Sequence, residues 1–578
     1  MGSEPVAGGR RPGIARLVPI AGWLPRYQRE WLRGDLAAGI AVTALIVPKN
    51  LGYAGIAGIP IENGLYAAAA GAIIYALFCT SRQISTGPSS SLAAVAGGAV
   101  LLTGLGGDQA AELVTAITLL TGALFLLLAL FKLGWIARFL SKPGITGFLA
   151  GAAIDGGIGE LPKLTGTTAD GVNAWRELGS WARSLGDLDG RTLAVGLVGL
   201  AVILALRFRA PAVPGALVVV AGGILASRLF DLGAHGVALV GHVPRGLPTP
   251  EVPSADVIRD HYATIAIAAV ALLLIGFSQT AGDARAFATR HRYRVDIDQE
   301  SVAQGMANVG AGLFQGMPVS TSLSASSLNE SAGARTPVAS LTTGGLVILT
   351  LIVLAPLFSD LPKAILSVVI IDAVVFGMID LAEFRRLGRV ARVDFWIAIA
   401  AVVGVLSAGV LAGVVIGVAL SLAWLVYVTT SPPMFELGRE AGTQVFRELD
   451  EHPGDETFPG IVVLRLDSGL FFATAQALDD RVRALADLDG TPLRGVVLDF
   501  EAVSFIDSQG AEQLREIRAL VESRGATLRL ARVKPPVRAV LRADRFIDAI
   551  GTDHIHGNVH RAVEAELAEA PRAPSETP

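Results

Sequence analysis

The chain has 578 residues, of which 52% are hydrophobic and only 17% are charged, and its mean hydropathy is +0.55. Because soluble domains carry about a quarter charged residues, this composition excludes an ordinary soluble protein and indicates a chain that crosses a membrane many times. The formal net charge of −4 gives no reason to expect a nucleic-acid partner, and the single cysteine, Cys79, excludes an internal disulfide and a cysteine-based metal site.

The N-terminal segment, residues 1–34, contains basic residues but no short apolar core followed by a cleavage site of small residues. We therefore expect no removable signal peptide. Fourteen apolar segments follow, each long enough to cross a bilayer or half of one, and they define a membrane domain over residues 35–430. The predicted spans are residues 35–56, 63–80, 88–105, 110–131, 143–162, 191–207, 212–230, 262–282, 299–315, 319–331, 336–358, 361–379, 394–408 and 410–429.

The connections between these spans differ in charge. Short cytoplasmic loops are enriched in Lys and Arg, whereas exported loops are not. The basic connections follow the second, fourth, sixth, eighth and twelfth spans, while others, such as "GIPIEN", are acidic or neutral. The basic residues are Arg82; Lys132, Arg138 and Lys142; Arg207 and Arg209; Arg285, Arg290, Arg292 and Arg294; Arg385, Arg386, Arg389 and Arg392. We therefore expect a multi-pass protein of the cell membrane with both ends in the cytoplasm.

Three proline-containing stretches interrupt the apolar pattern: "IVPKNLGYAGIAGIP" at Pro48, "ISTGPSSSLAAVAGG" at Pro88 and "FQGMPVSTSLSASSLNESAG" at Pro318. We predict that each proline breaks a helix beside one cavity, because irregular backbone at membrane depth is tolerated only where it lines protein or a cavity. The second and third stretches occupy the third and tenth spans, corresponding places in two halves of an inverted repeat.

Half-helices that start at those two breaks would point free N–H groups and positive dipole ends into the cavity. That arrangement predicts an anion as the ligand. In the alternative interpretation, the Ser and Thr residues only mediate close helix packing.

The C-terminal region, residues 431–570, is predicted to be a soluble α/β domain. "GIVVLRLDSGLFFATA", "GVVLDFEAVSFI" and "ATLRLARV" predict strands, and "PVRAVLRADRF" predicts a helix. "DSQGAEQLREIRALVESRG" predicts another helix, with Asp507 or Ser508 as its N-cap and Gly525 at its C-terminal end. Alternating strands and helices indicate a small sheet covered by helices, and residues 571–578 are expected to be a disordered tail.

Five stretches of the membrane domain carry a family resemblance. They are "VPKNLGYAGIAGIP", "GLYAAAAGAIIYALFCTSRQISTGPSSS", "KPGITGFLAG", "DIDQESVAQGMANVGAGLFQGMPVSTSLSASSLNESAGARTPVAS" and "LPKAILSVVI". The chain resembles the sulfate permease (SulP) family, the relatives of solute carrier family 26, over nearly its whole length, and its C-terminal region resembles the STAS domain of that family.

This resemblance implies an α-helical polytopic domain of fourteen segments, in a UraA-like inverted repeat of seven plus seven, followed by a small α/β STAS domain. It also implies a homodimer and an elevator-like secondary transport of an inorganic or small organic anion. By position, the family's substrate site lies between the N-terminal ends of the third and tenth segments, bordered by the first and eighth. The implied site residues are Tyr53, Ser89, Ser90, Ser91, Gln279, Ser320, Thr321, Ser322 and Ser324.

Three substitutions change the charge expected at that site. Where the family usually has Pro-Gln, this chain has Pro48 and Lys49, and where it has Ser-Phe-Ser-Arg, this chain ends the motif with Ala325. A frequent glutamate of the eighth segment is here Gln279. We hypothesise that Lys49 replaces the missing arginine as counter-ion of the substrate, because an unpaired ammonium in the membrane interior must face a polar cavity.

Two alternatives remain for Lys49: it reaches an interface, or it pairs with an acid such as Asp283 or Glu62. With Gln279 uncharged, proton binding at that position is not expected. Asp283, one turn later, is the predicted site for a coupling ion, either Na⁺ or H⁺, and the intramembrane acids Asp155 and Glu160 are further candidates. For Glu160 we favour an interfacial or paired carboxylate.

In the STAS-like loop, Gln509 occupies the position where related regulators have a phosphorylatable serine. Regulation by phosphorylation there is therefore not expected, and Ser508 is interpreted as a helix cap. The eight histidines show no metal-ligand spacing, and we find no nucleophile–base pair, so we expect neither an enzyme nor a metal or cofactor.

Two other functions stay open: an anion channel or a carrier of an uncharged substrate such as a nucleobase, and a membrane-anchored scaffold or sensor. Sulfate, bicarbonate, chloride and dicarboxylates all satisfy one cation and two helix N-termini, so the sequence does not choose among them.

Overall fold

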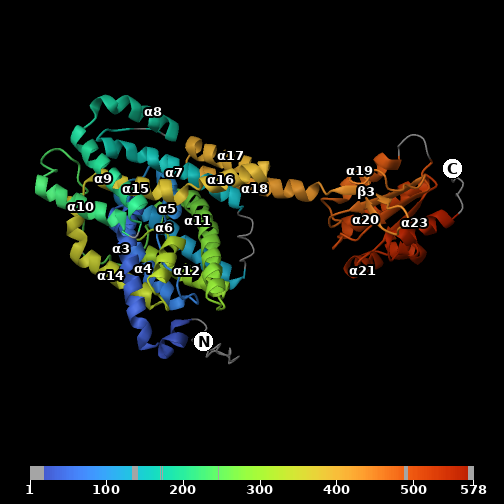
Figure 1. Ribbon diagram of the computed structural model, residues 1–578, viewed down its shortest axis with the longest axis horizontal. Coiled ribbons are helices and arrows are strands. Elements are labelled where there is room, and N and C mark those ends of the chain that lie inside the picture. Colours follow the sequence, from blue (N-terminus) through green and yellow to red (C-terminus); the bar gives the residue numbers. More distant parts are fainter. Residues whose placement is uncertain are drawn as a thin grey trace. The chain divides into compact units, whose positions relative to one another are not determined.

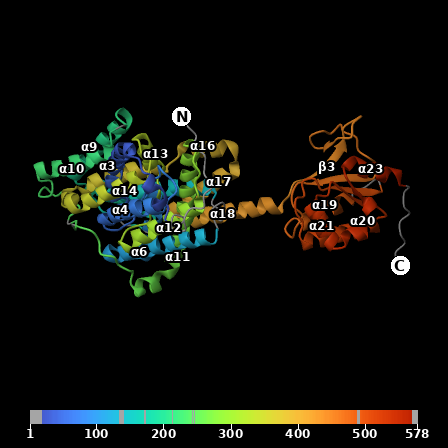
Figure 2. The same cartoon turned by 90° about the horizontal axis from the view of Figure 1, so that it is seen from below.

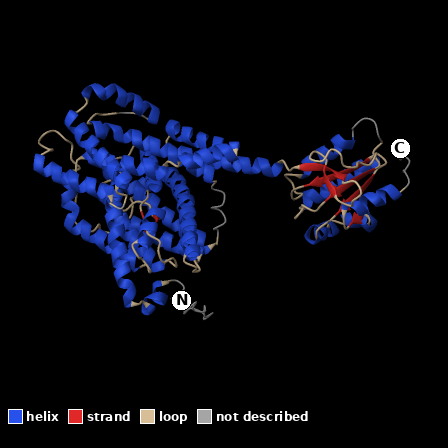
Figure 3. Cartoon of the chain, viewed as in Figure 1, coloured by secondary structure: helices blue, strands red, loops and turns tan. Residues whose placement is uncertain are grey.

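The computed structural model describes residues 18–132, 141–169, 171, 173–211, 213–241, 243–244, 246–486 and 492–569. The chain divides into two compact units, Met1–Ser421 and Leu422–Pro578 (Figure 1). The first unit is helical apart from two short strands, whereas the second combines a larger sheet with helices (Figure 3).

Each of the fourteen predicted spans coincides with a helix in the described part of the chain. These helices are α3 (Leu32–Ile56), α4 (Ile61–Phe78), α5 (Ser90–Thr103), α6 (Gly107–Leu130), α7 (Lys142–Thr165), α9 (Gly190–Arg209), α10 (Gly215–Phe230), α11 (Ala255–Arg290), α12 (Ile297–Leu313), α13 (Leu323–Ser331), α14 (Val338–Leu349), α15 (Lys363–Met378), α17 (Arg392–Ala408) and α18 (Val410–Thr430). By length and hydropathy alone, 8 helices among the described residues suffice to cross a membrane. Two of the remaining helices, α5 and α13, are short because each begins at a break in mid-segment.

Three further helices lie in stretches that the sequence analysis treated as connections or as the N-terminal segment. They are α2 (Ile20–Trp23), α8 (Ala174–Ser184) and α16 (Leu381–Val390). Both α8 and α16 have charged residues in the first and last turns and few buried positions, so hydropathy alone does not reveal them.

The helices of the first unit pack as two interlocked halves. The first helix of each half packs against the fourth helix of the other, α3 against α14 and α11 against α6, and the two second helices, α4 and α12, pack against each other. Figures 1 and 2 show α4 and α12 side by side at the centre of this group. This exchange of partners is what an inverted repeat of seven plus seven helices requires.

Two helix groups result from these contacts. We call α3–α6 with α11–α14 the core group, and α7, α9, α10, α15, α17 and α18 the gate group. Within the gate group, α7 packs against both α15 and α17, and α9 packs against α10 and α15. Contacts of α3 with α15 and α10 connect the two groups.

The predicted helix break at Pro48 is wrong. Helix α3 continues through this proline, which is buried inside it. A proline removes one backbone hydrogen bond, but membrane helices tolerate the loss where neighbouring helices hold both sides. Here α3 is held by α4, α14 and α15, so tertiary packing overrides the local preference.

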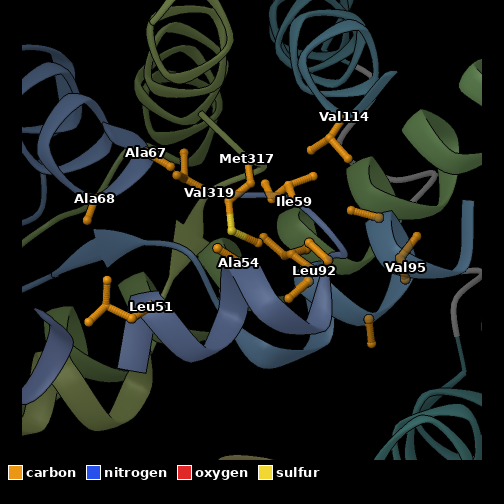
Figure 4. Packing of buried hydrophobic residues seen from close by; sticks show 14 of the residues in the cluster. Leu51, Ala54, Ile59, Ala67, Ala68, Leu92, Val95, Val114, Met317 and Val319 are labelled. Atoms are coloured by element: carbon orange, nitrogen blue, oxygen red, sulfur yellow. The ribbon is translucent and has the colours of Figure 1, made fainter. Parts of the chain in front are cut away.

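The core of the first unit surrounds the broken segment at Pro318. Figure 4 shows Met317 reaching toward Ala54 of α3, with Leu92 of α5 nearby. Met317 and Ala54 are 0% exposed and Leu92 is 1% exposed. The non-helical backbone is therefore enclosed by apolar side chains rather than by lipid.

The second unit contains a six-stranded sheet in the order β4-β3-β5-β6-β7-β8. Its strands are β3 (Met434–Arg439), β4 (Phe446–Glu448), β5 (Ile461–Leu466), β6 (Gly495–Asp499), β7 (Thr527–Ala531) and β8 (Ile555–His556). Strands β5 to β8 are parallel, and β3 is antiparallel to its neighbours. The three predicted strands correspond to β5, β6 and β7.

Helices cover both faces of this sheet. They are α19 (Ala475–Ala486), α20 (Ser508–Ser523), α21 (Pro535–Ala543), α22 (Phe546–Ile550) and α23 (Val559–Ala568). Helices α19 to α22 share one hydrophobic cluster with the sheet, and α23 packs on the other face. Asp507 caps α20 by accepting from the Gly510 N–H at 2.8 Å, so Asp507, one of the two predicted caps, is confirmed, and the interpretation of Ser508 as the cap is wrong.

Candidate functional site

Two short strands meet in the middle of the membrane domain. Strand β1 (Thr86–Gly87) pairs antiparallel with β2 (Ser320–Thr321), with Thr86 opposite Thr321 and Gly87 opposite Ser320. Figure 3 shows this pair as the small strands inside the helical unit. Helix α5 begins just after β1 and α13 just after β2, so the pairing brings two half-helix N-termini together.

The two half-helices begin in the same way. Ser89 caps α5, its Oγ accepting from the Leu92 N–H at 3.4 Å, and Ser322 caps α13, accepting from the Ala325 N–H at 3.3 Å.

A second hydroxyl lies two residues after each cap. The Ser89 and Ser91 Oγ atoms are 3.1 Å apart, and those of Ser322 and Ser324 are 3.3 Å apart. Two pairs of hydroxyls therefore occupy corresponding places at two positive helix ends.

Polar side chains of α12 support the irregular backbone. Gln304 and Asn308 are both 0% exposed. The Val319 carbonyl accepts from Gln304 Nε2 at 2.6 Å and from Asn308 Nδ2 at 2.9 Å, and the Val319 N–H donates to Asn308 Oδ1 at 3.0 Å. The break before α13 thus leaves this peptide satisfied, as membrane depth requires. Sequence reasoning missed both residues, although two amides one helical turn apart in an apolar segment are a signal for such support.

Replacing Asn308 with alanine is expected to destabilise the membrane domain. The buried Val319 N–H would lose its acceptor, at a cost of about 1–3 kcal/mol. Thermal unfolding in detergent measures the loss. The comparison variant is Asn63→Ala, which removes one hydrogen bond to the Gln315 carbonyl and should cost less. Equal stability of the wild type and Asn308→Ala would contradict this role.

The first and eighth helices contribute to the same region. Gln279 Nε2 of α11 donates to Ser91 Oγ at 3.1 Å, and its Oε1 is buried without a hydrogen-bond partner among the described residues. Tyr53 lies on α3, which packs against α5. The structure therefore brings Tyr53, Gln279 and the serines of α5 together.

Ser320 and Thr321 lie in β2 rather than in the first turn of α13. Ser320 is 0% exposed and its Oγ donates to the Gly276 carbonyl at 3.3 Å. Thr321 Oγ1 donates to Asp283 Oδ2 at 2.8 Å. Both hydroxyls face α11, so a threonine and a carboxylate of the predicted coupling site are in contact. Glu160, a further predicted acid, is paired with Lys163 at 2.7 Å.

Lys49 has no carboxylate within 4.0 Å in the part of the chain that the structure describes, so its predicted pairing with Asp283 or Glu62 is not found there. Asp372 lies on α15, which packs against α3, and it is bonded to Arg207 of α9. Sequence reasoning missed Asp372, although an isolated acid in the apolar run "LSVVIIDAVVF" is a signal of intramembrane function. Among the described residues no group of three or more His, Cys, Asp or Glu side chains has the arrangement of a metal site.

Two family models and several sequence relatives match this chain. The model of the sulfate permease family matches residues 32–401, and the model of the STAS domain matches residues 452–562. A probable sulfate transporter of Mycobacterium tuberculosis is 36% identical over 94% of this chain and 98% of its own length. A chloroplastic sulfate transporter of Arabidopsis thaliana is 30% identical over 96% of this chain and 83% of its own length.

Solved structures agree on the fold. The murine solute carrier 26 family member A9, an anion transporter in the inward-facing state, superposes with a TM-score of 0.88 at 21% identity, covering 98% of this chain and 97% of that chain. The transmembrane domain of the cyanobacterial bicarbonate transporter BicA superposes with a TM-score of 0.57 at 20% identity, covering 68% of this chain and 98% of that chain.

Proposed function

The chain belongs to the sulfate permease family, and from this premise we propose that it is a secondary transporter of a small anion that works by elevator-like alternating access. The predicted family and fold class are confirmed by the family matches and the superpositions. The family consists of multi-pass membrane transporters of anions and not of enzymes. The substrate, the mechanism and the coupling are the parts that we propose.

The observation that carries this proposal is the meeting of α5 and α13 at the β1–β2 pair. Each N-terminus presents backbone N–H groups and a positive dipole end, and each carries two serine hydroxyls. An anion held there accepts hydrogen bonds from both half-helices without a bidentate arginine. In this proposal Lys49 supplies a full positive charge, as a compact point charge rather than the planar fork of an arginine.

We assign the core group to the moving body and the gate group to the fixed one. The proposed binding residues lie on α3, α5, α11, α13 and β2 or cap α5 and α13, so the site would move as a unit. The contacts between the gate group and the core group are made mainly by α3. A rigid body that carries the whole site past a fixed surface exposes it to one side at a time.

The proposed coupling site is Asp283 with Thr321, which binds Na⁺ or H⁺ when the anion enters. We also propose a homodimer with both chain ends in the cytoplasm. Contacts between connections support a single side for the basic loops. Arg82, after α4, meets Tyr293, after α11, with its N–H donating to the Tyr293 hydroxyl at 3.3 Å, and Lys142 pairs with Glu383 of α16 at 3.1 Å.

The test is uptake by the purified protein in liposomes. Labelled sulfate is the first probe because the relatives from Mycobacterium tuberculosis and Arabidopsis thaliana are named as sulfate transporters, and bicarbonate, chloride and a dicarboxylate compete in a panel. Saturable uptake that shows counterflow supports the proposal. Current without saturation would indicate a channel, and uptake of a nucleobase without anion uptake would indicate the uncharged-substrate alternative. A STAS deletion that abolishes function while Lys49→Ala does not would indicate a scaffold.

A further inference from the structure

A half-buried ion pair of the gate group involves α15, the helix that packs against α3, which carries Lys49. Arg207, at the C-terminal end of α9, donates from Nε to Asp372 Oδ1 at 2.9 Å and from Nη2 to Oδ2 at 2.7 Å. The side chain of Asp372 is 7% exposed, and that of Arg207 is 37% exposed. The Arg207 guanidinium also lies 4.3 Å from the centroid of the Phe376 ring. Two-point pairing and the aromatic contact fix the carboxylate in place.

Helix α3 brings the core group to this pair. The packing of α3 on α15 is close enough that a Cβ at Gly52 would lie 3.2 Å from Ile370 Cγ1, two residues before Asp372. Lys49 and Tyr53 lie within one turn of Gly52 on α3, and α3 packs against both α15 and α5. Helix α3 therefore lies between α15, the gate-group helix that carries Asp372, and α5, a helix of the proposed site.

We propose that Asp372, held by Arg207, is a built-in counter-ion that occupies Lys49 electrostatically when the site is empty, so that a substrate anion must compete with it. This inference rests on the proposed function, because it takes Lys49 as the cation of the substrate site. An uncompensated ammonium inside the membrane is costly, and a fixed carboxylate lowers that cost in the empty carrier.

The position of the two charges on different helix groups has a mechanistic consequence. Moving the empty core group would separate Lys49 from Asp372, whereas a loaded core group carries its own anion. Asp372 therefore acts as an electrostatic latch: it weakens substrate binding and holds the empty carrier back. Exchange of one anion for another is then faster than net flux.

Two variants of the pair are expected to shift anion binding in opposite directions. Asp372→Asn removes the competitor, so the dissociation constant should fall by about three- to tenfold; Arg207→Gln frees the carboxylate to act on Lys49, so it should rise by a similar factor. The full chain in detergent is titrated with labelled sulfate and with labelled chloride. The matched control is Glu383→Gln, which removes another buried carboxylate, one that pairs with Arg386 and Lys142, and it should leave the constant unchanged.

Transport supplies the second readout. In liposomes the ratio of net uptake to exchange should rise for Asp372→Asn and fall for Arg207→Gln. A purely structural ion pair predicts that both variants change binding and this ratio in the same direction, which would overturn the inference. If Asp372→Asn does not fold, Arg207→Gln alone tests the inference. A lower ratio of net uptake to exchange in Arg207→Gln supports the latch, because mere loosening of the ion pair would raise that ratio.

The failure of this inference is distinguishable from failure of the proposed function. If Lys49→Gln binds the anion with the same affinity as the wild type, the proposed site itself is refuted. Loss of binding in Lys49→Gln, with unchanged constants in both pair variants, would refute the latch alone.

Discussion

Lys49→Gln is expected to lower the affinity for the transported anion by about 30-fold or more. Removing one partner of a buried, hydrogen-bonded charge pair costs about 2–5 kcal/mol, and the hydroxyls and helix ends that remain are only partial charges. The loss should appear as a higher KM and dissociation constant, with the protein still folded. Binding titration and initial uptake rates measure it.

The control for this variant is Lys363→Gln. Lys363 is an exposed lysine at the first position of α15, so the same change of charge there should leave KM unaltered. Lys49→Arg retains the positive charge but replaces a compact ammonium by a planar guanidinium. The variant should therefore keep part of the affinity and change the order of anion affinities in the panel. Equal affinity in Lys49→Gln and the wild type would show that the cation of the site lies elsewhere.

Ala325→Arg in the Lys49→Gln background asks whether the charge has moved between helices. Ala325 lies in the first turn of α13 and is 4% exposed, so the longer side chain must displace its neighbours to reach the site. Partial return of uptake in the double variant is the expected result. No return, with the double variant folded, would mean that the two positions are not equivalent places for the counter-ion.

The sequence was informative where structure is set locally. The two half-helices begin where glycine and proline stop a helix and a following serine caps the next one, and all of these signals lie within a few residues. Pro48 has the same local signal but a different outcome, because helices from three other parts of the chain pack against α3. A short stretch of sequence does not reveal contacts with such distant segments of the chain.

The electrostatic surroundings of Lys49 were also beyond local patterns. Arg207 and Asp372 are 165 residues apart in the chain. In the sequence, Arg207 served only as one of the basic residues that assign a loop to the cytoplasmic side. The inverted repeat places α9 next to α15, and only that contact turns a loop arginine and a lone acid into a pair. The same holds for Asp283, whose contact with Thr321 depends on how β2 lies against α11.

Asp283→Asn is expected to abolish accumulation of the anion driven by an ion gradient while leaving anion exchange in place. The carboxylate is the charged group that contacts β2, through the Thr321 hydroxyl at 2.8 Å, so an ion bound to it would act on the start of α13. An amide keeps the hydrogen bond but has no charge for Na⁺ or H⁺. Uptake with and without each gradient, alongside exchange, measures the difference.

Asp155→Asn is the matched control for this variant. Asp155 is also a half-buried acid of a membrane helix, but it lies on α7 of the gate group, which packs mainly against α15 and α17. Its removal should leave gradient-driven accumulation unchanged. Thr321→Val, which removes the hydroxyl but not the charge, should weaken coupling without abolishing it. If Asp283→Asn accumulates the anion as the wild type does, the coupling ion does not bind at Asp283. A carrier that transports the anion without a co-transported cation then becomes the better description.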